Sequence, residues 1–476
     1  MAPVSSFTTL PLVLLVASTL STLALADPVH VPIARRKTAR VLDLNEEAFR
    51  LRQRYGKTNA TSLPVKSSGT GRRAALAGLP IGDQDNDSSY FATFPQQFNV
   101  ILDTGSSDLW LAGDNCQRCS PSTPLFKTSS SSTFKTIGTS TTQINYGSGS
   151  VAGVTSSDTV QMGGFKIDGQ TLLNANNLKT GLLDGDVSGI LGLAFQGIAE
   201  TKAVPFWQAL ITDKQLTSPE FGFYLRRAPA TNRVQDIPGG VFTLGGTNGT
   251  LFSGDIDFVN MPATGAGTFW LLSMTALTLN GQNVAISTGN NALSAIDTGT
   301  TLIGGPTADV QAFWAAVPNS APSPSGPGYF NFPCNQQLSV SMSFGGKSWP
   351  ISSQDMNIGT EQNDNTRCVG AIFDLEAGTS ITASDGNPGW VVGDTFLKNV
   401  YSVFRSDPPS VGFAELSTNA GGTGTPNAAS APSTTSTTSP GQNDSSDKKS
   451  AATTTTTSTF VSAFAVLISA VLFNLL

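Results

Sequence analysis

The residues best suited to chemistry in this 476-residue chain are two aspartates in matched sequence settings. Asp103 opens an Asp-Thr-Gly tripeptide, and Asp297 opens a second one 194 residues later. Each tripeptide follows an apolar, strand-like run and precedes two small hydroxyl residues. A separation about the size of one lobe predicts that each lobe supplies one carboxylate to a shared cleft. Two facing carboxylates can share a proton and activate water by general acid–base catalysis.

The histidine content excludes the hydrolytic mechanisms that depend on imidazole. The chain has a single histidine, His30, which lies before both aspartate motifs. Ser-His-Asp and Cys-His mechanisms need an imidazole base, and the common zinc hydrolase sites need imidazole ligands. We therefore expect no metal and no cofactor. The mechanism that remains is acid–base catalysis by carboxylates at acidic pH.

The elements that must position these aspartates are mostly strands. From Ile81 to Glu415 the chain is rich in Gly, Ser and Thr, and short alternating apolar runs end at turn residues. Strands are expected at 98–102, 241–244 and 338–344, and helices at 204–215 and 307–317. About 335 residues suffice for two packed cores. We predict a mainly β, bilobal fold, with an N-terminal lobe over 81–258 and a C-terminal lobe over 259–415.

The N-terminus has the pattern of a secretion signal over 1–26. No charge precedes Asp27, residues 10–25 are largely apolar, and Ala24-Leu25-Ala26 provides a small-residue cleavage site. A membrane anchor is the alternative, but the apolar stretch is short and is broken by Ser and Thr. Four cysteines also fit an extracytoplasmic chain.

The segment 27–80 is basic, with 11 Lys and Arg against 4 Asp and Glu, whereas the rest of the chain has 16 against 29. A basic leader can lie across an acidic cleft at neutral pH and detach when acid protonates the carboxylates. This indicates a propeptide that inhibits its own enzyme. The alternative is a solvated linker, or a segment that contacts membrane or nucleic acid; we expect no nucleic-acid partner. Arg72-Arg73 is the candidate processing site, which places the mature N-terminus between Ala74 and Asp85.

Five motifs in order resemble those of the pepsin-like aspartic endopeptidases, of fungal type. The first and second catalytic loops of that family are similar to Asp103-Thr104-Gly105-Ser106-Ser107-Asp108-Leu109-Trp110 and Asp297-Thr298-Gly299-Thr300-Thr301. The tip of the β-hairpin flap that closes over substrate resembles Tyr146-Gly147-Ser148-Gly149. The strands behind the two loops resemble Ile190-Leu191-Gly192 and Val391-Val392-Gly393. The resemblance spans residues 81–415, which we call the body of the chain. It implies hydrolysis of peptide bonds in polypeptide substrates.

The resemblance assigns a role to each residue of these motifs. Asp103 and Asp297 activate the attacking water, and which of them acts as base is a property of the pair. Gly105 and Gly299 allow the tight loops, and Thr104 and Thr298 form hydrogen bonds to the backbone of the opposite lobe. Ser106 and Thr300 donate hydrogen bonds to the carboxylates. Tyr146 lies over the substrate, with Trp110 behind it. Taken singly, each Asp-Thr-Gly is also compatible with an ordinary turn, and the flap motif with a plain hairpin tip.

The four cysteines pair most simply within each lobe, as Cys116 with Cys119 and Cys334 with Cys368, and the family shows the same local pairing. Cys-x-x-Cys is also compatible with zinc binding or thiol redox chemistry. The secreted context, the lack of histidines and the lack of a following helix argue against both.

One segment departs from the family pattern. The family places an Ile-Gly-Thr-Pro type segment before the strand that leads into the first catalytic loop, but here 89–93 runs almost directly into 94–98. We interpret this as either a mistaken exon boundary or a real shortening that weakens the support under Asp103. The second function class is therefore a catalytically silent pepsin-like scaffold that binds or inhibits another protein. Retention of both aspartates and Tyr146 favours the enzyme.

The C-terminal part resembles an attachment signal. Residues 416–459 form a Ser/Thr-rich linker, and 460–476 form an apolar tail that reaches the C-terminus. This pattern predicts a GPI anchor at the cell surface or cell wall, and a tail-anchored transmembrane helix is the alternative. Glycosylation sequons stand at Asn59, Asn86, Asn248 and Asn443. We expect a monomer.

Overall fold

The structure is a computed structural model that describes residues 28–35, single positions 44, 48, 51, 52 and 55, and ranges 83–84, 89–92, 96–146, 149–179, 182–183, 187–227, 237–377 and 388–420. The chain divides into a unit over 1–429 and a second unit over 430–476. All described residues belong to the first unit, so the signal at 1–26, the tail at 460–476 and nearly all of the linker lie outside them. No helix among the described residues is long and apolar enough to cross a membrane.

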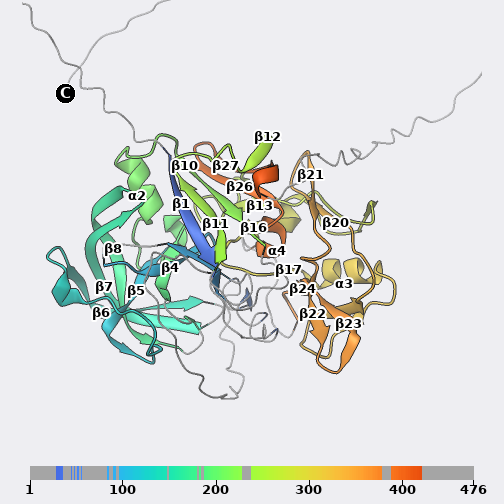
Figure 1. Cartoon of the computed structure of the whole chain (residues 1–476), viewed down its shortest axis with the longest axis horizontal. Coiled ribbons are helices and arrows are strands. Elements are labelled where there is room, and N and C mark those ends of the chain that lie inside the picture. The colour runs from blue at the N-terminus through green and yellow to red at the C-terminus, as the bar shows by residue number, and fades with distance from the viewer. Residues whose placement is uncertain are drawn as a thin grey trace, which may run out of the picture. The chain divides into compact units, whose positions relative to one another are not determined.

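The largest sheet has 14 strands (Figure 1). It includes strands from both halves of the body, which we define as residues 81–258 (first half) and 259–415 (second half). In spatial order they are β12 (Phe252–Asn260), β27 (Pro409–Leu416), β26 (Val400–Ser406), β10 (Glu220–Leu225), β11 (Ile237–Leu244), β1 (Val29–Arg35), β3 (Ser89–Ala92), β4 (Asn99–Asp103), β9 (Val187–Gly192), β5 (Leu109–Gln117), β8 (Phe165–Leu178), β7 (Gly149–Met162) and β6 (Lys135–Tyr146), with β2 (Asp83–Gln84) paired to β3. Strand β10 pairs with β26, so this sheet joins the two halves.

Three smaller sheets complete the strands of the described region. They are β13 (Leu271–Ser273), β16 (Leu293–Ile296), β25 (Trp390–Val392), β17 (Ile303–Gly305) and β24 (Ile372–Asp374); β15 (Gln282–Asn283), β14 (Ala276–Leu279), β20 (Val340–Ser343) and β21 (Ser348–Ile351); and β18 (Ala321–Pro322), β19 (Phe330–Pro333), β23 (Asp364–Gly370) and β22 (Asn357–Glu361). The predicted mainly β, bilobal pepsin-like fold is confirmed. The three expected strands are observed as β4, within β11, and as β20.

Helices are short and lie outside the sheets. In the described ranges between 83 and 420 they are α2 (Phe206–Thr212), α3 (Thr307–Ala315) and α4 (Asp394–Leu397), with 3-10 helices η1 (Thr128–Ser130), η2 (Gln196–Ile198), η3 (Gly289–Ala292) and η4 (Thr418–Ala420). Both predicted helices are confirmed, with tighter bounds, as α2 and α3. Each helix directly follows a proline, Pro205 or Pro306. Proline fits at the start of a helix because the N–H groups there have no partner within the helix, and proline has no N–H.

Beside the strand that leads to each aspartate lies a parallel strand that ends at or just before a glycine. Strand β9 pairs with β4, and β25 pairs with β16. A Cβ atom on Gly192 would lie 2.3 Å from the carbonyl carbon of Ser107, and one on Gly393 would lie 2.1 Å from the backbone oxygen of Thr300. No side chain fits where the two backbones pass so closely. This explains why both apolar strand motifs end in glycine.

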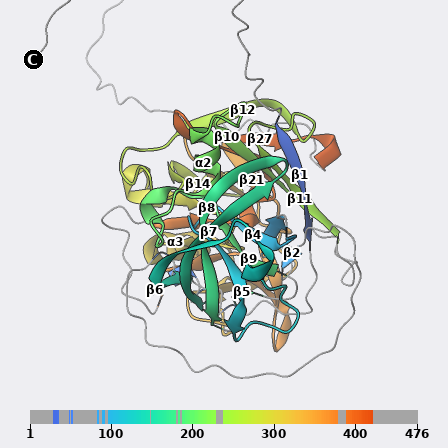
Figure 2. The ribbon, with the colours of Figure 1, turned by 90° about the vertical axis from the view of Figure 1, so that its left-hand side faces the viewer.

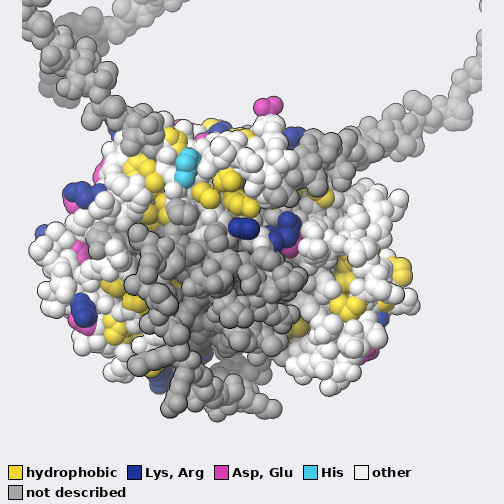
Figure 3. Space-filling view, viewed as in Figure 1, with side chains coloured by type: hydrophobic (Ala, Val, Ile, Leu, Met, Phe, Trp, Pro, Cys, Tyr) yellow, Lys and Arg dark blue, Asp and Glu magenta, His cyan; other side chains and the backbone are white. Residues whose placement is uncertain are grey.

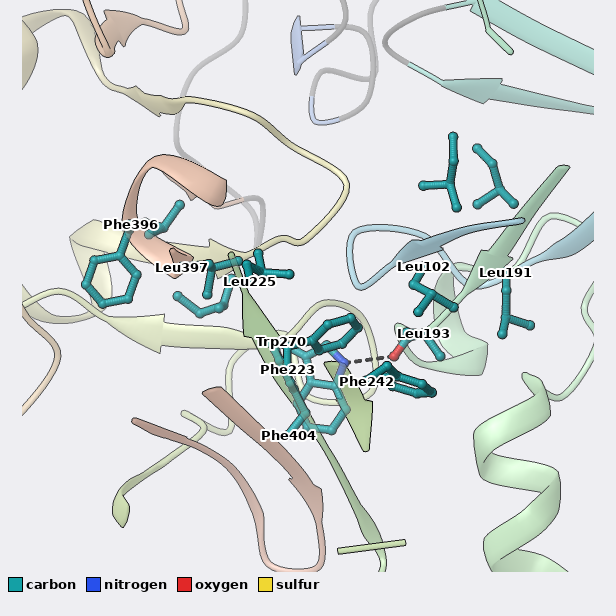
Figure 4. Close-up of a cluster of buried hydrophobic side chains, with 14 of the residues drawn as sticks. Leu102, Leu191, Leu193, Phe223, Leu225, Phe242, Trp270, Phe396, Leu397 and Phe404 are labelled. Carbon is teal, nitrogen blue, oxygen red and sulfur yellow. Dashed lines mark hydrogen bonds between the residues drawn. The ribbon is translucent and has the colours of Figure 1, made fainter. Parts of the chain in front are cut away.

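The core beneath these strands is aromatic and aliphatic and crosses between the halves of the body. Figure 4 shows Leu102 beside Leu191, and both are buried on the paired strands β4 and β9. Trp270 is fully buried, and its Nε1 donates a 2.9 Å hydrogen bond to the backbone oxygen of Leu193. The ring of Trp270 also lies 5.3 Å from that of Phe404 on β26. Trp270, near the start of the second half, is thereby packed against Leu193 of the first half.

Two disulfide bonds are present, Cys116–Cys119 and Cys334–Cys368. The first closes a bend at the end of β5. The second joins β23 to the residue that follows β19, and its cysteines are 34 positions apart in the chain. Each bond therefore lies within one half of the body.

Candidate active site

Asp103 is the last residue of β4, and its side chain is fully buried. The loop that follows turns back on the carboxylate. The Gly105 N–H donates to Asp103 Oδ1 at 2.9 Å, and the Ser106 hydroxyl donates to Oδ2 at 2.6 Å. Donors of this kind stabilise the charged form of a buried carboxylate and fix its orientation.

Asp297 follows directly on β16 and is held in the same way. It is also fully buried. The Gly299 N–H donates to Asp297 Oδ1 at 2.8 Å, and the Thr300 hydroxyl donates to Oδ2. The two tripeptides that matched in sequence thus have the same hydrogen-bond pattern, and the hydroxyl residue after each glycine contacts the carboxylate.

The threonines of the two motifs interlock the loops. The Thr104 N–H donates to the Thr298 hydroxyl at 3.1 Å, and the Thr298 N–H donates to the Thr104 hydroxyl at 2.9 Å. Each hydroxyl also donates across the junction, from Thr104 to the backbone oxygen of Ile296 at 2.9 Å and from Thr298 to that of Leu102 at 2.8 Å. Both threonines are buried, so water does not compete for these bonds. The second loop therefore has a fixed place against the first.

Gly105 gives a direct measure of how closely the loops meet. A Cβ atom at Gly105 would lie 2.5 Å from both carboxylate oxygens of Asp297. The carboxylate of the second motif therefore lies directly against the first loop, and the missing side chain leaves room for it. The structure brings together the two aspartates that the sequence placed 194 residues apart.

Strands β6 and β7 form the hairpin that we expected as the flap. Tyr146 ends β6 opposite Gly149, the first residue of β7. The Trp110 Nε1 donates to the Tyr146 hydroxyl at 2.8 Å, which is the contact that the resemblance implied, and both side chains are buried. Figure 2 shows β5, β6 and β7 on one side of the molecule. The intervening Gly147 and Ser148, which we expected at the hairpin tip, lie outside the described residues.

A residue of the basic leader reaches the second aspartate. The Tyr55 hydroxyl donates a 2.8 Å hydrogen bond to Asp297 Oδ2, and both groups are buried. The expectation of a leader across the cleft did not include this tyrosine. The sequence nevertheless contains a pattern that indicates this contact segment, because Leu44, Ala48, Leu51 and Tyr55 have the spacing of one apolar helix face. These four positions are helical in the structure.

The leader makes two further attachments to the body. Ala48, Leu51 and Tyr55 are buried in one cluster with Leu271, Leu293 and other residues of the second half. Earlier in the leader, β1 pairs antiparallel with β11 from Val29 to Arg35. The leader thus contributes a strand to the largest sheet as well as side chains near the aspartates.

His30 has no place in this site. It lies on β1, is exposed, and its Nδ1 is 3.1 Å from the Thr243 hydroxyl. Figure 3 shows its imidazole in cyan on the surface of the molecule. Among the described residues, no group of three His, Cys, Asp or Glu side chains is arranged to hold a metal ion.

Comparison with known proteins gives the same classification as the site. The profile of the family described as "Eukaryotic aspartyl protease" matches residues 91–416. The chain is 36% identical over 392 residues to "Major aspartyl peptidase 1" of Cryptococcus neoformans var. grubii, covering 80% of this chain and 76% of that protein. It is 32% identical to cathepsin D of Gallus gallus, covering 69% and 81%, and 32% identical to "Aspartic protease" of Phaffia rhodozyma, covering 72% and 80%.

The chain belongs to the eukaryotic aspartyl protease family, which the profile match over most of the body shows directly. It is an aspartic-type endopeptidase by class, a hydrolase that acts on peptide bonds.

Proposed function

We propose that the protein is an acid-active endopeptidase, made as a latent precursor, in which Asp103 and Asp297 activate a water molecule between them. The observation that carries this is the reciprocal threonine bonding described above, which fixes one carboxylate against the loop of the other. Two carboxylates held so closely do not both ionise cheaply, so the pair retains one proton over a wide acid range. That shared proton supplies the acid, and the ionised partner supplies the base.

The reaction follows from these two roles. One carboxylate accepts a proton from water while the water oxygen forms a bond to the scissile carbonyl carbon. The other carboxyl gives its proton to the carbonyl oxygen, which becomes a hydroxyl in the tetrahedral intermediate. As the C–N bond breaks, a proton passes to the leaving amine and the new carboxyl group is released. Tyr146, backed by Trp110, closes over the substrate as part of the flap.

The leader keeps the precursor inactive. Its Tyr55 hydroxyl occupies one oxygen of Asp297, which the attacking water needs, and its cluster residues hold the segment in place. The leader carries a net excess of basic residues and the body a net excess of acidic ones, so their attraction weakens as acid protonates the carboxylates. Acid therefore releases the leader, and cleavage near Arg72-Arg73 makes the release permanent.

The destination of the enzyme is the secretory pathway and then the cell surface or cell wall. The signal pattern at 1–26 and the tail pattern at 460–476 support this, with a GPI anchor that replaces the tail. Release of the protein from cells by a phosphatidylinositol-specific phospholipase is the expected result. Recovery of Leu476 in the mature protein would overturn the anchor.

The decisive assay uses the full chain and a denatured protein substrate. After incubation at about pH 3 to 5, the chain should release peptides, and a statine-type inhibitor, whose hydroxyl takes the place of the attacking water, should stop the release. A folded chain that cleaves nothing between about pH 3 and pH 7 would instead support the silent scaffold.

A further inference from the structure

A second leader side chain, Arg52, is held in a site built by the body of the enzyme. Its Nε donates to the backbone oxygen of Leu375 at 3.0 Å. Its Nη2 donates to the backbone oxygens of Asp374 at 2.9 Å and of Pro327 at 3.1 Å. We call these three carbonyl groups, with the Asp374 carboxylate behind them, the Arg52 cradle. It presents only acceptors to the guanidinium, which is the pattern that a cation requires.

The cradle is rigid because its two loops are tied together. The Asp374 carboxylate accepts hydrogen bonds from the Thr307 hydroxyl and from the N–H groups of Glu376 and Ala377, each at 2.9 Å. The Asp374 N–H donates in turn to the backbone oxygen of Gly328 at 2.9 Å. These bonds hold the carbonyl groups toward the guanidinium without any contribution from the leader.

Gly328 leaves the space into which the guanidinium fits. A Cβ atom there would lie 2.9 Å from Arg52 Nη2 and 2.7 Å from the backbone oxygen of Asp374. Burial lowers the pKa of Arg52, while the charges of Tyr329 and Asp374 oppose this effect, and a guanidinium stays protonated in proteins in any case. Pro327 is exposed and Gly328 half-buried even beside the leader, so the cradle opens toward solvent.

The cradle lies close to the aspartates. Arg52 and Tyr55 are three positions apart in the leader, so their Cα atoms lie at most about 11 Å apart. Tyr55 contacts Asp297 and Arg52 contacts the cradle, so a substrate that reaches the aspartates passes near the cradle. An extended peptide advances about 3.3 Å per residue, so about three residues of an extended substrate span the distance between Arg52 and Tyr55.

We propose that, once the leader has left, the Arg52 cradle binds a basic side chain of the polypeptide substrate and makes the enzyme selective for substrates with arginine at one fixed position near the scissile bond. Departure of the leader leaves three carbonyl groups that had a charged donor, and an arginine of the substrate restores those bonds. This inference rests on the proposed function, because it assigns a substrate class to the same cleft.

The test is a peptide series assayed with enzyme that has been activated from the full chain by acid. A single arginine is placed in turn at each of three positions on either side of one scissile bond, and each peptide is paired with its citrulline analogue, which has the same shape without the charge. We expect one position at which arginine raises kcat/KM about tenfold over citrulline, since bonds from a charged donor are stronger by about 1.4 kcal/mol. Lysine at that position should give an intermediate value.

Variants of the Arg52 cradle test whether it causes the preference for arginine over citrulline. Gly328→Ala fills the space beside the guanidinium, and Asp374→Asn removes the charge while keeping an oxygen acceptor for the loop. Either change should lower the arginine-to-citrulline ratio toward one. Asp364→Asn removes an equal charge from an exposed position of the same half, outside the cradle, and should leave the ratio unchanged.

The outcomes distinguish this inference from the function on which it rests. Equal cleavage of all arginine and citrulline pairs would overturn the cradle as a substrate site but leave the endopeptidase in place. A preference that persists in both Gly328→Ala and Asp374→Asn would also overturn it. Failure to cleave any peptide would contradict the proposed function itself.

Discussion

Thr104 and Thr298 each use one hydroxyl twice, as acceptor from the opposite N–H and as donor to an opposite carbonyl. This makes them the residues on which the placement of the two carboxylates depends most. The repeated Asp-Thr-Gly motif made the aspartates and threonines predictable, because a matched pair of motifs indicates matched loops. Tyr55 and Arg52 were not predictable individually, because no motif fixes where a leader helix docks.

Replacement of Thr104 by valine keeps the side-chain volume but leaves the Thr298 N–H and the Ile296 carbonyl without their buried partner. Each unpaired group costs about 1–3 kcal/mol, so the free energy of unfolding should fall by about 2 kcal/mol or more. The rate kcat should fall as well, because the loops lose their alignment. Denaturant unfolding and peptide hydrolysis measure the two effects. Thr104→Ser, which keeps the hydroxyl, is the matched control, and an equal loss in both variants would show that the hydroxyl is not responsible.

Replacement of Tyr55 by phenylalanine removes the bond to Asp297 but keeps the ring in its cluster. A hydrogen bond to a charged group contributes about 1.5–3 kcal/mol. The full-length precursor should therefore open more readily, and its conversion to the mature form at mildly acidic pH should be at least tenfold faster. Electrophoresis of samples taken over time follows the conversion. Unchanged kinetics would mean that Tyr55 contributes nothing to latency.

At the scale of elements, the pairing of β4 with β9 and of β16 with β25 explains how two short loops are supported from behind. The shortened segment before Asp103 does not remove this support, since β3 still pairs with β4 through Phe91 opposite Ile101. The apolar run before each aspartate predicted β4 and β16, and the resemblance implied β9 and β25. The pairing of β10 with β26 was not predicted. Pairing between strands far apart in the chain depends on tertiary packing, which local sequence patterns do not encode.

The two disulfides should differ in their contribution to stability. Linking cysteines 34 positions apart removes more conformational entropy from the unfolded chain than linking cysteines 3 positions apart, and the loop-entropy relation gives about 4 kcal/mol against about 2. Cys334→Ala with Cys368→Ala should lower the free energy of unfolding by about twice as much as Cys116→Ala with Cys119→Ala. Denaturant unfolding of the two double variants compares them directly. A larger loss for the Cys116 and Cys119 pair would contradict the prediction.

Glu361, at the end of β22, ties the loop that contains Pro327 to its sheet. Its carboxylate accepts from the Ser323 hydroxyl at 2.6 Å, from Asn331 Nδ2 at 2.8 Å and from the Ser325 hydroxyl. Burial alone would raise the pKa of Glu361, but hydrogen bonds from Ser323, Ser325 and Asn331 outweigh it and lower the pKa below its usual range. The carboxylate therefore stays charged in acid where an ordinary glutamate would not.

The lowered pKa of Glu361 determines how the stability of the fold changes with pH. A folded pKa below the unfolded value of about 4.3 gives stability that is present above that pH and is lost as the pH falls through the folded pKa. Glu361→Gln should be less stable than the parent chain by about 1.5–3 kcal/mol near pH 6, and the difference should shrink below about pH 4. Unfolding is measured in an Asp103→Asn background to prevent self-digestion. A difference that grows as the pH falls would contradict the assignment.

At the scale of the whole molecule, the leader and the body are one folded system. The leader contributes β1 to the sheet that joins both halves and a helix face to the core of the second half. Its charge predicts a role in latency, and that role stays a prediction. Its place as a strand of the sheet was not predictable, because the pattern Val-His-Val-Pro-Ile contains a proline and has no turn signal that identifies its partner.

The two carboxylates are proposed to act as one unit, so the direct test is hydrolysis of a single peptide by Asp103→Asn, Asp297→Asn and the double variant, each confirmed to be folded by thermal unfolding. Asparagine keeps the shape of the side chain but neither shares the proton nor accepts one. We predict that each single variant lowers kcat/KM by about 10³-fold or more, and that the double variant loses little beyond that. A single variant that retains a tenth or more of the parent activity would contradict the shared-proton mechanism.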